Sequence, residues 1–241
     1  TARLYGQVSI EQFAGRTLPY ADDLVNLILV DTRFDAQHAE SEIMRVLAPR
    51  GVAVVREAEN KTWLSRIPHP VTRIGDGWAK FAKPLSDDID EWTHFLHDAS
   101  GNAVACDQQV GPPRRMQWNV GPLWSRSHEH VSSVAAMISG GGRLFYVVDE
   151  GLTSITHNTE ARIPERWMLV ARDAFNGVLL WKRPLPDWRG DEWASSALRG
   201  RPASVPKRIV TDGHRLYATL SHRAGVSILD PATGEILKSI P

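Results

Sequence analysis

The stretch ARDAFNGVLLWKRPL (Ala171–Leu185) places an apolar strand, a tight turn and a second strand with a tryptophan one after another. A weaker copy, SILDPATGEILKSI (Ser227–Ile240), occurs near the end of the sequence. In both copies the first strand ends at Asp, and a Gly four residues later suits a backbone conformation that side chains resist. We expect two antiparallel hairpins, with the ring of Trp181 packed over the neighbouring sheet and Lys238 at the matching place in the second copy.

Each hairpin follows a related segment, a Gly-containing turn that leads through Arg143-Leu144 or Arg215-Leu216 into an apolar strand. The interval to the hairpin is longer in the first copy, so we expect an insertion within residues 150–166. Tandem β units of this kind indicate a repeat architecture. A four-stranded sheet per unit predicts about two blades of a truncated β-propeller in residues 132–241.

The beginning of the chain has a different pattern. The run LVNLILVDT (Leu24–Thr32) is typical of a buried strand, and apolar residues at helical spacing follow it in residues 36–47. A second strand, VAVVRE (Val52–Glu57), comes next. The order strand, helix, strand predicts a βαβ unit with a parallel sheet, so residues 1–59 are interpreted as a partial α/β region.

Residues 60–131 form a connector rich in Trp, His and Pro, without clear periodicity. Within it, KPLSDDIDEWTHFLHD predicts a helix with Ser86 as its cap and an apolar stripe of Ile89, Trp92 and Leu96. The fold class expected for the chain is therefore a multi-part α+β protein, partial α/β followed by all-β propeller blades. Both ends look cut, which indicates a piece of a longer protein.

Composition limits the functional classes. Lys and Arg number 28, as do Asp and Glu, so the formal net charge is zero. No excess of cations is available to neutralise phosphates, which argues against a nucleic-acid partner. A single cysteine, Cys106, rules out an internal disulfide framework and a Cys-based zinc site. No apolar run is long enough for a transmembrane segment. The location stays open between exported or periplasmic and cytoplasmic.

A histidine cluster is the main candidate for chemistry. On the expected helix, His94, His97 and Asp98 share a face, and on an extended segment His128 and His130 point to the same side. These residues are the candidate catalytic set, and the four histidines are the candidate metal ligands. They could equally bind a sugar or serve acid–base chemistry. The alternative is that they hydrogen-bond an irregular segment against the β region.

Three other motifs have a functional and an ordinary interpretation. DDIDE (Asp87–Glu91) could be a calcium loop, or the solvated start of a helix. SGGGR (Ser139–Arg143) could cradle a phosphate, although it precedes a strand and so favours a turn. Trp188 and Trp193 could stack on sugar rings, or belong to the core.

The repeat resembles the pyrroloquinoline-quinone-type propeller repeat, whose usual form is Ala-x-Asp-x-x-Thr-Gly followed by a strand with Trp. Ala171-Arg172-Asp173 and Asn176-Gly177 match the first copy, and Asp230, Thr233 and Gly234 match the second. The resemblance covers roughly the last 110 residues. It implies a propeller fold and, because many such repeats form scaffolds, a binding or scaffold module in which quinone is not expected.

The beginning resembles the C-terminal half of a class I S-adenosylmethionine-dependent methyltransferase. Leu18–Asp22 match its Leu-Pro-(Phe/Tyr)-x-Asp loop. The segment EIMRVLAPRG (Glu42–Gly51) matches its Glu-x-x-Arg-Val-Leu-x-Pro-Gly-Gly pattern, with Arg50 in place of the first Gly. The resemblance implies Asp22 as a cofactor-binding residue and S-adenosylmethionine binding only with a Gly-rich loop upstream. The join of the two parts resembles large proteins of Planctomycetes-type bacteria.

Three functional hypotheses follow. The first is a binding or scaffold module without a complete catalytic set, with a carbohydrate or protein ligand on the propeller face. The second is an S-adenosylmethionine-dependent methyltransferase fused to a propeller. The third is a His- or metal-dependent carbohydrate-active enzyme built on His94, His97, His128 and His130.

Overall fold

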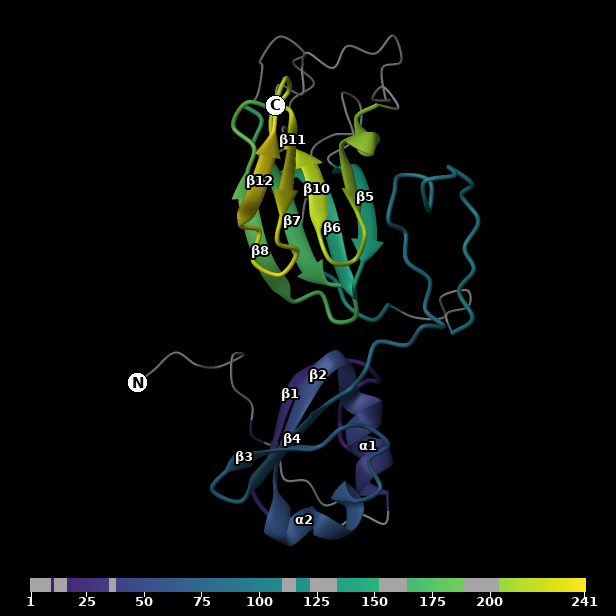
Figure 1. Cartoon of the computed structure of the whole chain (residues 1–241), viewed down its shortest axis with the longest axis vertical. Coiled ribbons are helices and arrows are strands. Elements are labelled where there is room, and N and C mark those ends of the chain that lie inside the picture. The colour runs from purple at the N-terminus through teal and green to yellow at the C-terminus, as the bar shows by residue number, and fades with distance from the viewer. Residues whose placement is uncertain are drawn as a thin grey trace. The chain divides into compact units, whose positions relative to one another are not determined.

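The computed structural model describes residues 10, 17–34, 38–109, 116–121, 134–151, 164–188 and 204–241 (Figure 1). The described residues are mostly β, with two short helices and three separate four-stranded sheets. The chain divides into two compact units, Thr1–Pro84 and Leu85–Pro241. Each unit is described by itself below.

The first unit contains one sheet and both helices. Its elements are β1 (Val25–Val30), α1 (Ala39–Val46), β2 (Leu47–Arg56), α2 (Glu57–Leu64), β3 (Thr72–Gly75) and β4 (Trp78–Ala82). The strand order is β1-β2-β4-β3. β1 and β2 pair in parallel, and α1 connects them. The strand, helix and strand expected between Leu24 and Glu57 are therefore confirmed.

The parallel α/β sheet expected for this region is wrong. β4 pairs antiparallel with both β2 and β3, so one strand pair of the sheet is parallel and two are antiparallel. A tight hairpin between β3 and β4 makes that pair antiparallel, and the second strand of the hairpin, β4, lies antiparallel beside β2. Asp76 and Gly77 form the two-residue loop of the hairpin, with φ of 48° and 76°, a combination that fits the right-handed twist of paired strands.

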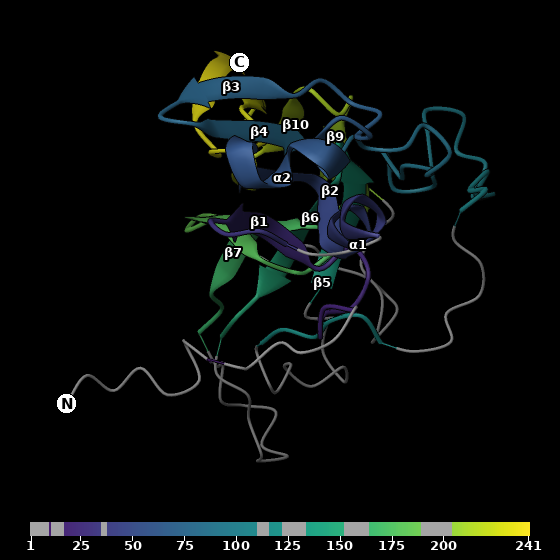
Figure 2. The same cartoon turned by 90° about the horizontal axis from the view of Figure 1, so that it is seen from below.

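Both helices of the first unit pack on the same core. Ile43 from α1 and Trp63 from α2 belong to one buried cluster with Val55 of β2 and Phe81 of β4. The Trp63 and Phe81 rings meet edge to face, 6.4 Å between centroids. Figure 2 shows α1 and α2 beside the sheet from a second direction. This burial explains why two helices of only eight residues each are stable here.

The second unit contains two four-stranded sheets, each antiparallel throughout. The first consists of β5 (Val134–Gly140), β6 (Arg143–Asp149), β7 (Trp167–Asp173) and β8 (Leu179–Pro184), in that order. The second follows a 3-10 turn, η2 (Pro206–Arg208), and consists of β9 (Ile209–Thr211), β10 (Leu216–Thr219), β11 (Val226–Leu229) and β12 (Ile236–Ile240).

The two predicted hairpins are confirmed as β7–β8 and β11–β12. The expectation of propeller blades is wrong for the described residues, because these two sheets are separate and form no closed propeller. A sheet can also bury its apolar face against a second sheet, and here residues of both sheets share one core. The predicted insertion falls between β6 and β7, where residues 152–163 lie outside the described residues.

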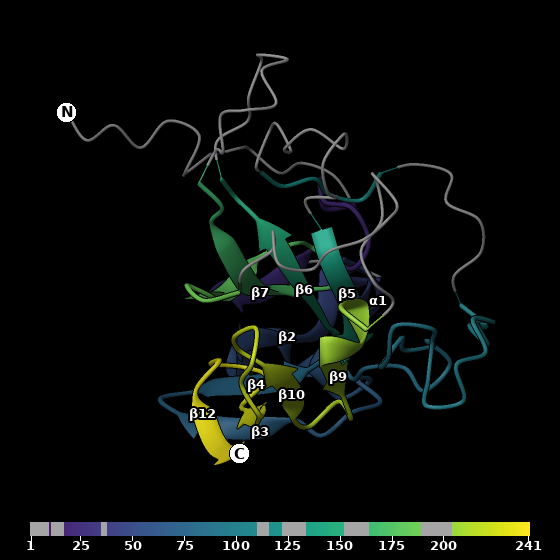
Figure 3. The ribbon, with the colours of Figure 1, turned by 90° about the horizontal axis from the view of Figure 1, so that it is seen from above.

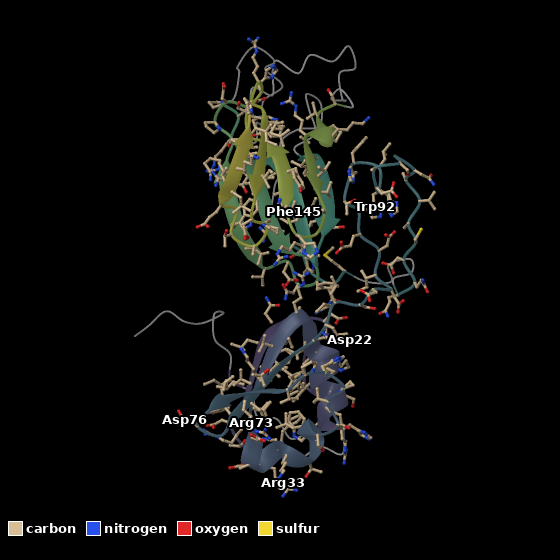
Figure 4. The ribbon with its side chains drawn as sticks, viewed as in Figure 1. Asp22, Arg33, Arg73, Asp76, Trp92 and Phe145 are labelled. Carbon is tan, nitrogen blue, oxygen red and sulfur yellow. The ribbon has the colours of Figure 1, made fainter. Side chains whose placement is uncertain are left out.

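The shared core lies between the two sheets (Figure 3). Phe145 of β6 and Leu169 of β7 are fully buried there, as are Leu216 and Leu229 of the second sheet. Figure 4 labels Phe145 among these strands. Val148, Met168 and Val170 form another buried cluster, with neighbouring residues of β6 and β7 alternating between the two clusters. The first sheet therefore carries buried apolar side chains on both of its faces.

Both hairpin turns have the same hydrogen bonds. Asp173 Oδ1 accepts from the backbone N–H groups of Phe175 and Asn176, and Asp230 Oδ1 accepts likewise from the second and third residues after it. Gly177 and Gly234 then adopt φ of 73° and 74°. The two copies of the motif thus build the same turn, with an Asp side chain that satisfies the N–H groups of the bend.

Each turn is covered by a tryptophan from earlier in the chain. The Trp181 indole N–H donates to Pro231 O at 3.1 Å, and a Cβ on Gly234 would lie 2.7 Å from Trp181 Cδ2. In the same way, Trp118 N–H donates to Ala174 O at 3.2 Å, and its ring lies over Gly177. We use the name indole joint for this pair of contacts, a tryptophan ring packed over the turn glycine and its indole N–H bonded to a carbonyl of the same turn. Only glycine allows the ring to approach the turn so closely, so glycine is required for two independent reasons.

Candidate functional site

The segment that contains the histidine cluster is not helical. Residues 85–109 form turns and extended backbone, so the helix predicted from the Ile89, Trp92 and Leu96 stripe is wrong. The backbone of this segment instead bonds to strand edges. Ser139 N–H of β5 donates to Trp92 O at 2.8 Å, and Thr211 N–H of β9 donates to Thr93 O at 3.0 Å. In a helix these backbone groups would bond within the segment. Here the edges of the two sheets provide their hydrogen-bond partners instead.

Glu91, Trp92 and Thr93 together form what we call the bridging segment, because they bond to both sheets of the second unit. The Glu91 carboxylate accepts from the N–H groups of Gly141 and Gly142 in the turn between β5 and β6. The SGGGR motif is therefore a turn between strands. Its first glycine is also required by packing, since a Cβ on Gly140 would lie 2.5 Å from Thr211 Cγ2.

His97 holds the bridging segment in place. His94 N–H donates to His97 O, which closes a short turn, and His97 adopts φ of 72°. That conformation costs a non-glycine residue about 1 kcal/mol or more. The His97 ring is 11% exposed, and its Nε2 lies 2.9 Å from Asp90 Oδ2. The buried hydrogen bond to Asp90 offsets the backbone strain.

Asp90 is the centre of this small network. Besides His97, its carboxylate accepts from the N–H of Cys106 at 2.6 Å and from the N–H of Glu91 at 2.9 Å. These donors lower the pKa of Asp90, with the Cys106 N–H as the largest cause and the His97 side chain next. The pKa of Asp98 is lowered as well, mainly by hydrogen bonds from Ser100. Both carboxylates are stabilised in their charged form.

The candidate catalytic and metal residues are only partly brought together. His97 Nδ1 lies 3.6 Å from Asp98 Oδ2, and His94 Nδ1 lies 2.8 Å from Thr93 Oγ1. His128 and His130 lie outside the described residues, so their approach to His94 and His97 stays a prediction. Within the described part of the chain, no three His, Cys, Asp or Glu side chains form a group that could hold a metal ion.

A groove of about 570 Å³ lies next to the bridging segment. The side chains of Trp92 and Phe95 contribute to its wall, along with Leu144 of β6 and Pro206 of η2. Strand β5 contributes residues 134–139. Figure 4 labels Trp92 on the segment that runs beside the two sheets. The volume is within the range of ligand pockets, and the lining is predominantly apolar.

Asp22, the proposed cofactor residue, has a structural partner in the first unit. Arg45 Nη1 donates to Asp22 Oδ1 at 2.6 Å and to Tyr20 O at 2.9 Å. Arg45 Nη2 donates to Leu18 O and to Glu42 Oε1, and Leu18 N–H donates to the same Glu42 carboxylate. The two sequence patterns that carry the methyltransferase resemblance are thus joined by one guanidinium. A cofactor role of Asp22 stays a prediction.

Sequence reasoning missed several residues of the site. Asp90 and Glu91 belong to the DDIDE motif, which predicts a calcium loop or the charged start of a helix, and no motif singles out Phe95. The three consecutive glycines were a usable signal, because a turn with several free N–H groups needs an acceptor such as Glu91. Trp188 is fully buried and its ring lies 6.3 Å from that of Trp167, which confirms the core interpretation. Trp193 lies outside the described residues.

Among the helices of the described residues, none is long and apolar enough to span a membrane. Comparison of the chain with protein-family models, with curated proteins and with solved structures finds no match.

Proposed function

We propose that this chain is a binding module without a catalytic centre of its own, in which tandem four-stranded sheets serve as a rigid scaffold. The observation that carries the proposal is the apolar groove beside the bridging segment. Trp92 is fixed there by two hydrogen bonds to Ser139, one to the backbone N–H and one to Oγ. A wall held by several hydrogen bonds is preorganised, and preorganisation lowers the entropic cost of binding.

The repeat itself supports the scaffold part of the proposal. The same Asp-capped turn occurs twice, and an indole covers each turn; through one of these contacts, Trp181 attaches the first sheet to the second. Stability in such arrays comes from contacts between neighbours, which leaves loops and edges available for ligands. We therefore include the pyrroloquinoline-quinone-type repeat in this proposal as the type of unit, with no quinone.

The chemistry of the histidine cluster supports binding over catalysis. His97 Nε2 is engaged by Asp90, whose remaining capacity is used by Cys106 and Glu91. A general base needs a nitrogen within reach of a substrate proton. With its ring buried and hydrogen-bonded in this way, His97 acts as a positioning residue for the bridging segment.

A titration of the intact chain tests the proposal. Oligosaccharides, peptides and apolar small molecules are added while tryptophan fluorescence is followed, and each ligand is recovered for mass spectrometry. We expect binding without chemical change, weakened at least about tenfold by Phe95→Ser. Val104→Ser is the matched control, because Val104 is 57% exposed on the same segment and does not line the groove. Turnover of any bound ligand would overturn the proposal.

The two enzymatic alternatives predict other outcomes, each with its own measurement. A methyltransferase transfers label from S-adenosylmethionine to an acceptor. A metal-dependent carbohydrate-active enzyme binds zinc stoichiometrically and loses sugar cleavage in His97→Ala and His130→Ala variants. Either result would replace the binding module with an enzyme.

A further inference from the structure

Strand β5 has one edge that its own sheet does not use. The strand order β5-β6-β7-β8 places it at the side of the sheet. On its outer edge, Ser139 N–H donates to the Trp92 carbonyl of the bridging segment. The bridging segment then leaves β5 and bonds through Thr93 to Thr211 of the other sheet. An edge strand that already bonds to one extended segment can bond to another extended segment further along the same edge.

The register of β5 shows which groups face this edge. Met137, Ile138 and Ser139 pair with Tyr146, Phe145 and Leu144 of β6 without a shift. Ser139 N–H points away from β6, because it bonds to Trp92. Main-chain groups of alternate residues in an antiparallel strand point to the same side. The N–H and C=O of Met137 therefore face outward as well, into the groove.

The groove combines this main-chain edge with apolar walls. Met137 is 49% exposed and Val134 is 39% exposed, and both line the groove with Trp92 and Phe95. The one side-chain hydroxyl in the lining belongs to Ser139, and its Oγ accepts from Trp92 N–H. A ligand must therefore supply apolar side chains together with hydrogen-bonding groups that match the repeat of a strand.

We infer that the outer edge of β5 is a docking strand for an extended apolar peptide, which adds to the sheet next to the bridging segment. The inference rests on the proposed binding function and names its ligand class. The peptide continues a main-chain interface that the chain already forms between Trp92 and Ser139. Its backbone pairs with Met137, and its alternate side chains enter the groove.

Other ligand classes match these groups less well. A sugar needs several polar side chains around its hydroxyls, and the described lining offers one hydroxyl that is already engaged. An apolar small molecule would cover the Met137 main-chain groups without bonding to them, which costs the desolvation of a buried donor and acceptor. An extended peptide offers apolar side chains to the walls of the groove and main-chain hydrogen bonds to the edge of β5.

The experiment uses the intact chain and a fluorescent library of acetylated hexapeptides that alternate Val, Leu or Phe with Thr or Lys. Binding is measured by anisotropy, and the best peptide is then N-methylated at one amide at a time. Only every second amide of an added strand faces β5. We expect methylation of one alternating set to weaken binding at least about tenfold and methylation of the other set to change it less than about twofold.

Two variants separate the backbone of Met137 from its side chain. Met137→Pro removes the outward N–H, and proline is tolerated at a strand edge where the N–H is not in the ladder. Met137→Ala keeps the N–H and shortens the side chain. We expect the proline variant to lose at least about tenfold in affinity and the alanine variant less than about threefold. Circular dichroism verifies folding, and the methylation pattern on the unaltered chain decides the matter if the proline variant unfolds.

Three results would overturn the inference. The first is that no peptide of the library binds. The second is that methylation weakens binding regardless of position, and the third is that folded Met137→Pro binds like the unaltered chain. Failure here is distinguishable from failure of the proposed function. Phe95-dependent binding of a sugar or an apolar small molecule, recovered unchanged, leaves the binding module standing and removes only the peptide. Chemical conversion of a ligand removes the binding module itself.

Discussion

The two compact units fix their loops with different chemistry. In the first unit, the charged guanidinium of Arg45 binds the loop at residues 18–22 through two carbonyls and the Asp22 carboxylate, and it also pairs with Glu42 of α1. In the second, an indole lies over a glycine, with one neutral hydrogen bond from Trp181 to Pro231. The first arrangement depends on ionisation. The second depends on shape, so these two contacts should respond differently to substitution and to pH.

The largest effect should come from filling the space under an indole. Gly234→Val adds a β-branched side chain at φ of 74° and places its Cβ 2.7 Å from Trp181 Cδ2. Strain and overlap together should cost about 4 kcal/mol of unfolding free energy. Gly101→Val is the control, because Gly101 has φ of 72° and nothing within 4 Å of a Cβ. It should lose only about 1.5 kcal/mol to strain.

Urea unfolding of both variants measures the difference. Equal losses would mean that the indole moves aside without cost, and the indole joint would then not be the contact that holds the two sheets together.

The next effect concerns the ion-paired loop. Arg45→Met removes the partner of Glu42, whose side chain is only 10% exposed. A nearly buried carboxylate without its cation should cost about 3 kcal/mol of unfolding free energy. Arg73→Met is the control, because Arg73 is 79% exposed in its pair with Glu57 and such surface pairs contribute little. Thermal unfolding followed by circular dichroism should show a large loss for the first variant and no measurable loss for the second. Comparable losses would contradict the special role assigned to Arg45.

These contrasts show what could be predicted from the sequence. The Asp-x-x-x-Gly turns were predictable, because a capping carboxylate and a left-handed glycine act within five residues. The βαβ start was predictable from periodicity. The antiparallel hairpin at Asp76-Gly77 carries a recognisable turn signal, but it lies in a stretch interpreted as a connector without periodicity.

The candidate site was less predictable, since its geometry is set by distant residues. The stripe of Ile89, Trp92 and Leu96 satisfied the rule for an amphipathic helix. Nothing local shows that Ser139 and Thr211 offer strand edges to the same segment. Such long-range competition for backbone hydrogen bonds overrides helix propensity. As a result, His97 lies in a turn and not on the face of the predicted helix.

A smaller effect on stability should appear when the pH is lowered. The Arg45 side chain lowers the pKa of Glu42, so this carboxylate is more acidic in the folded than in the unfolded chain. The resulting stabilisation is present above the unfolded pKa, about 4.3, and is lost as the pH falls through the folded value. We expect Tm to fall on acidification below about pH 4, and less steeply in Glu42→Gln. Calorimetry from pH 7 to pH 2.5 provides the comparison. Parallel curves for the two proteins would show that Glu42 is not a source of the pH dependence.

The smallest predicted effect is a difference between substitutions in the outer strands β8 and β12, which occupy matching places in the two sheets. Trp181→Phe keeps an aromatic ring over Gly234 and removes the N–H that donates to Pro231, which should cost about 1 kcal/mol. Lys238 stands at the matching position of β12, where every residue is exposed. Lys238→Met should therefore change the unfolding free energy by less than about 0.5 kcal/mol. Urea titration resolves the two values. An equal loss at Lys238 would mean that β12 is held by a contact as specific as the indole joint, and that the difference between the two outer strands lies in the side chain used.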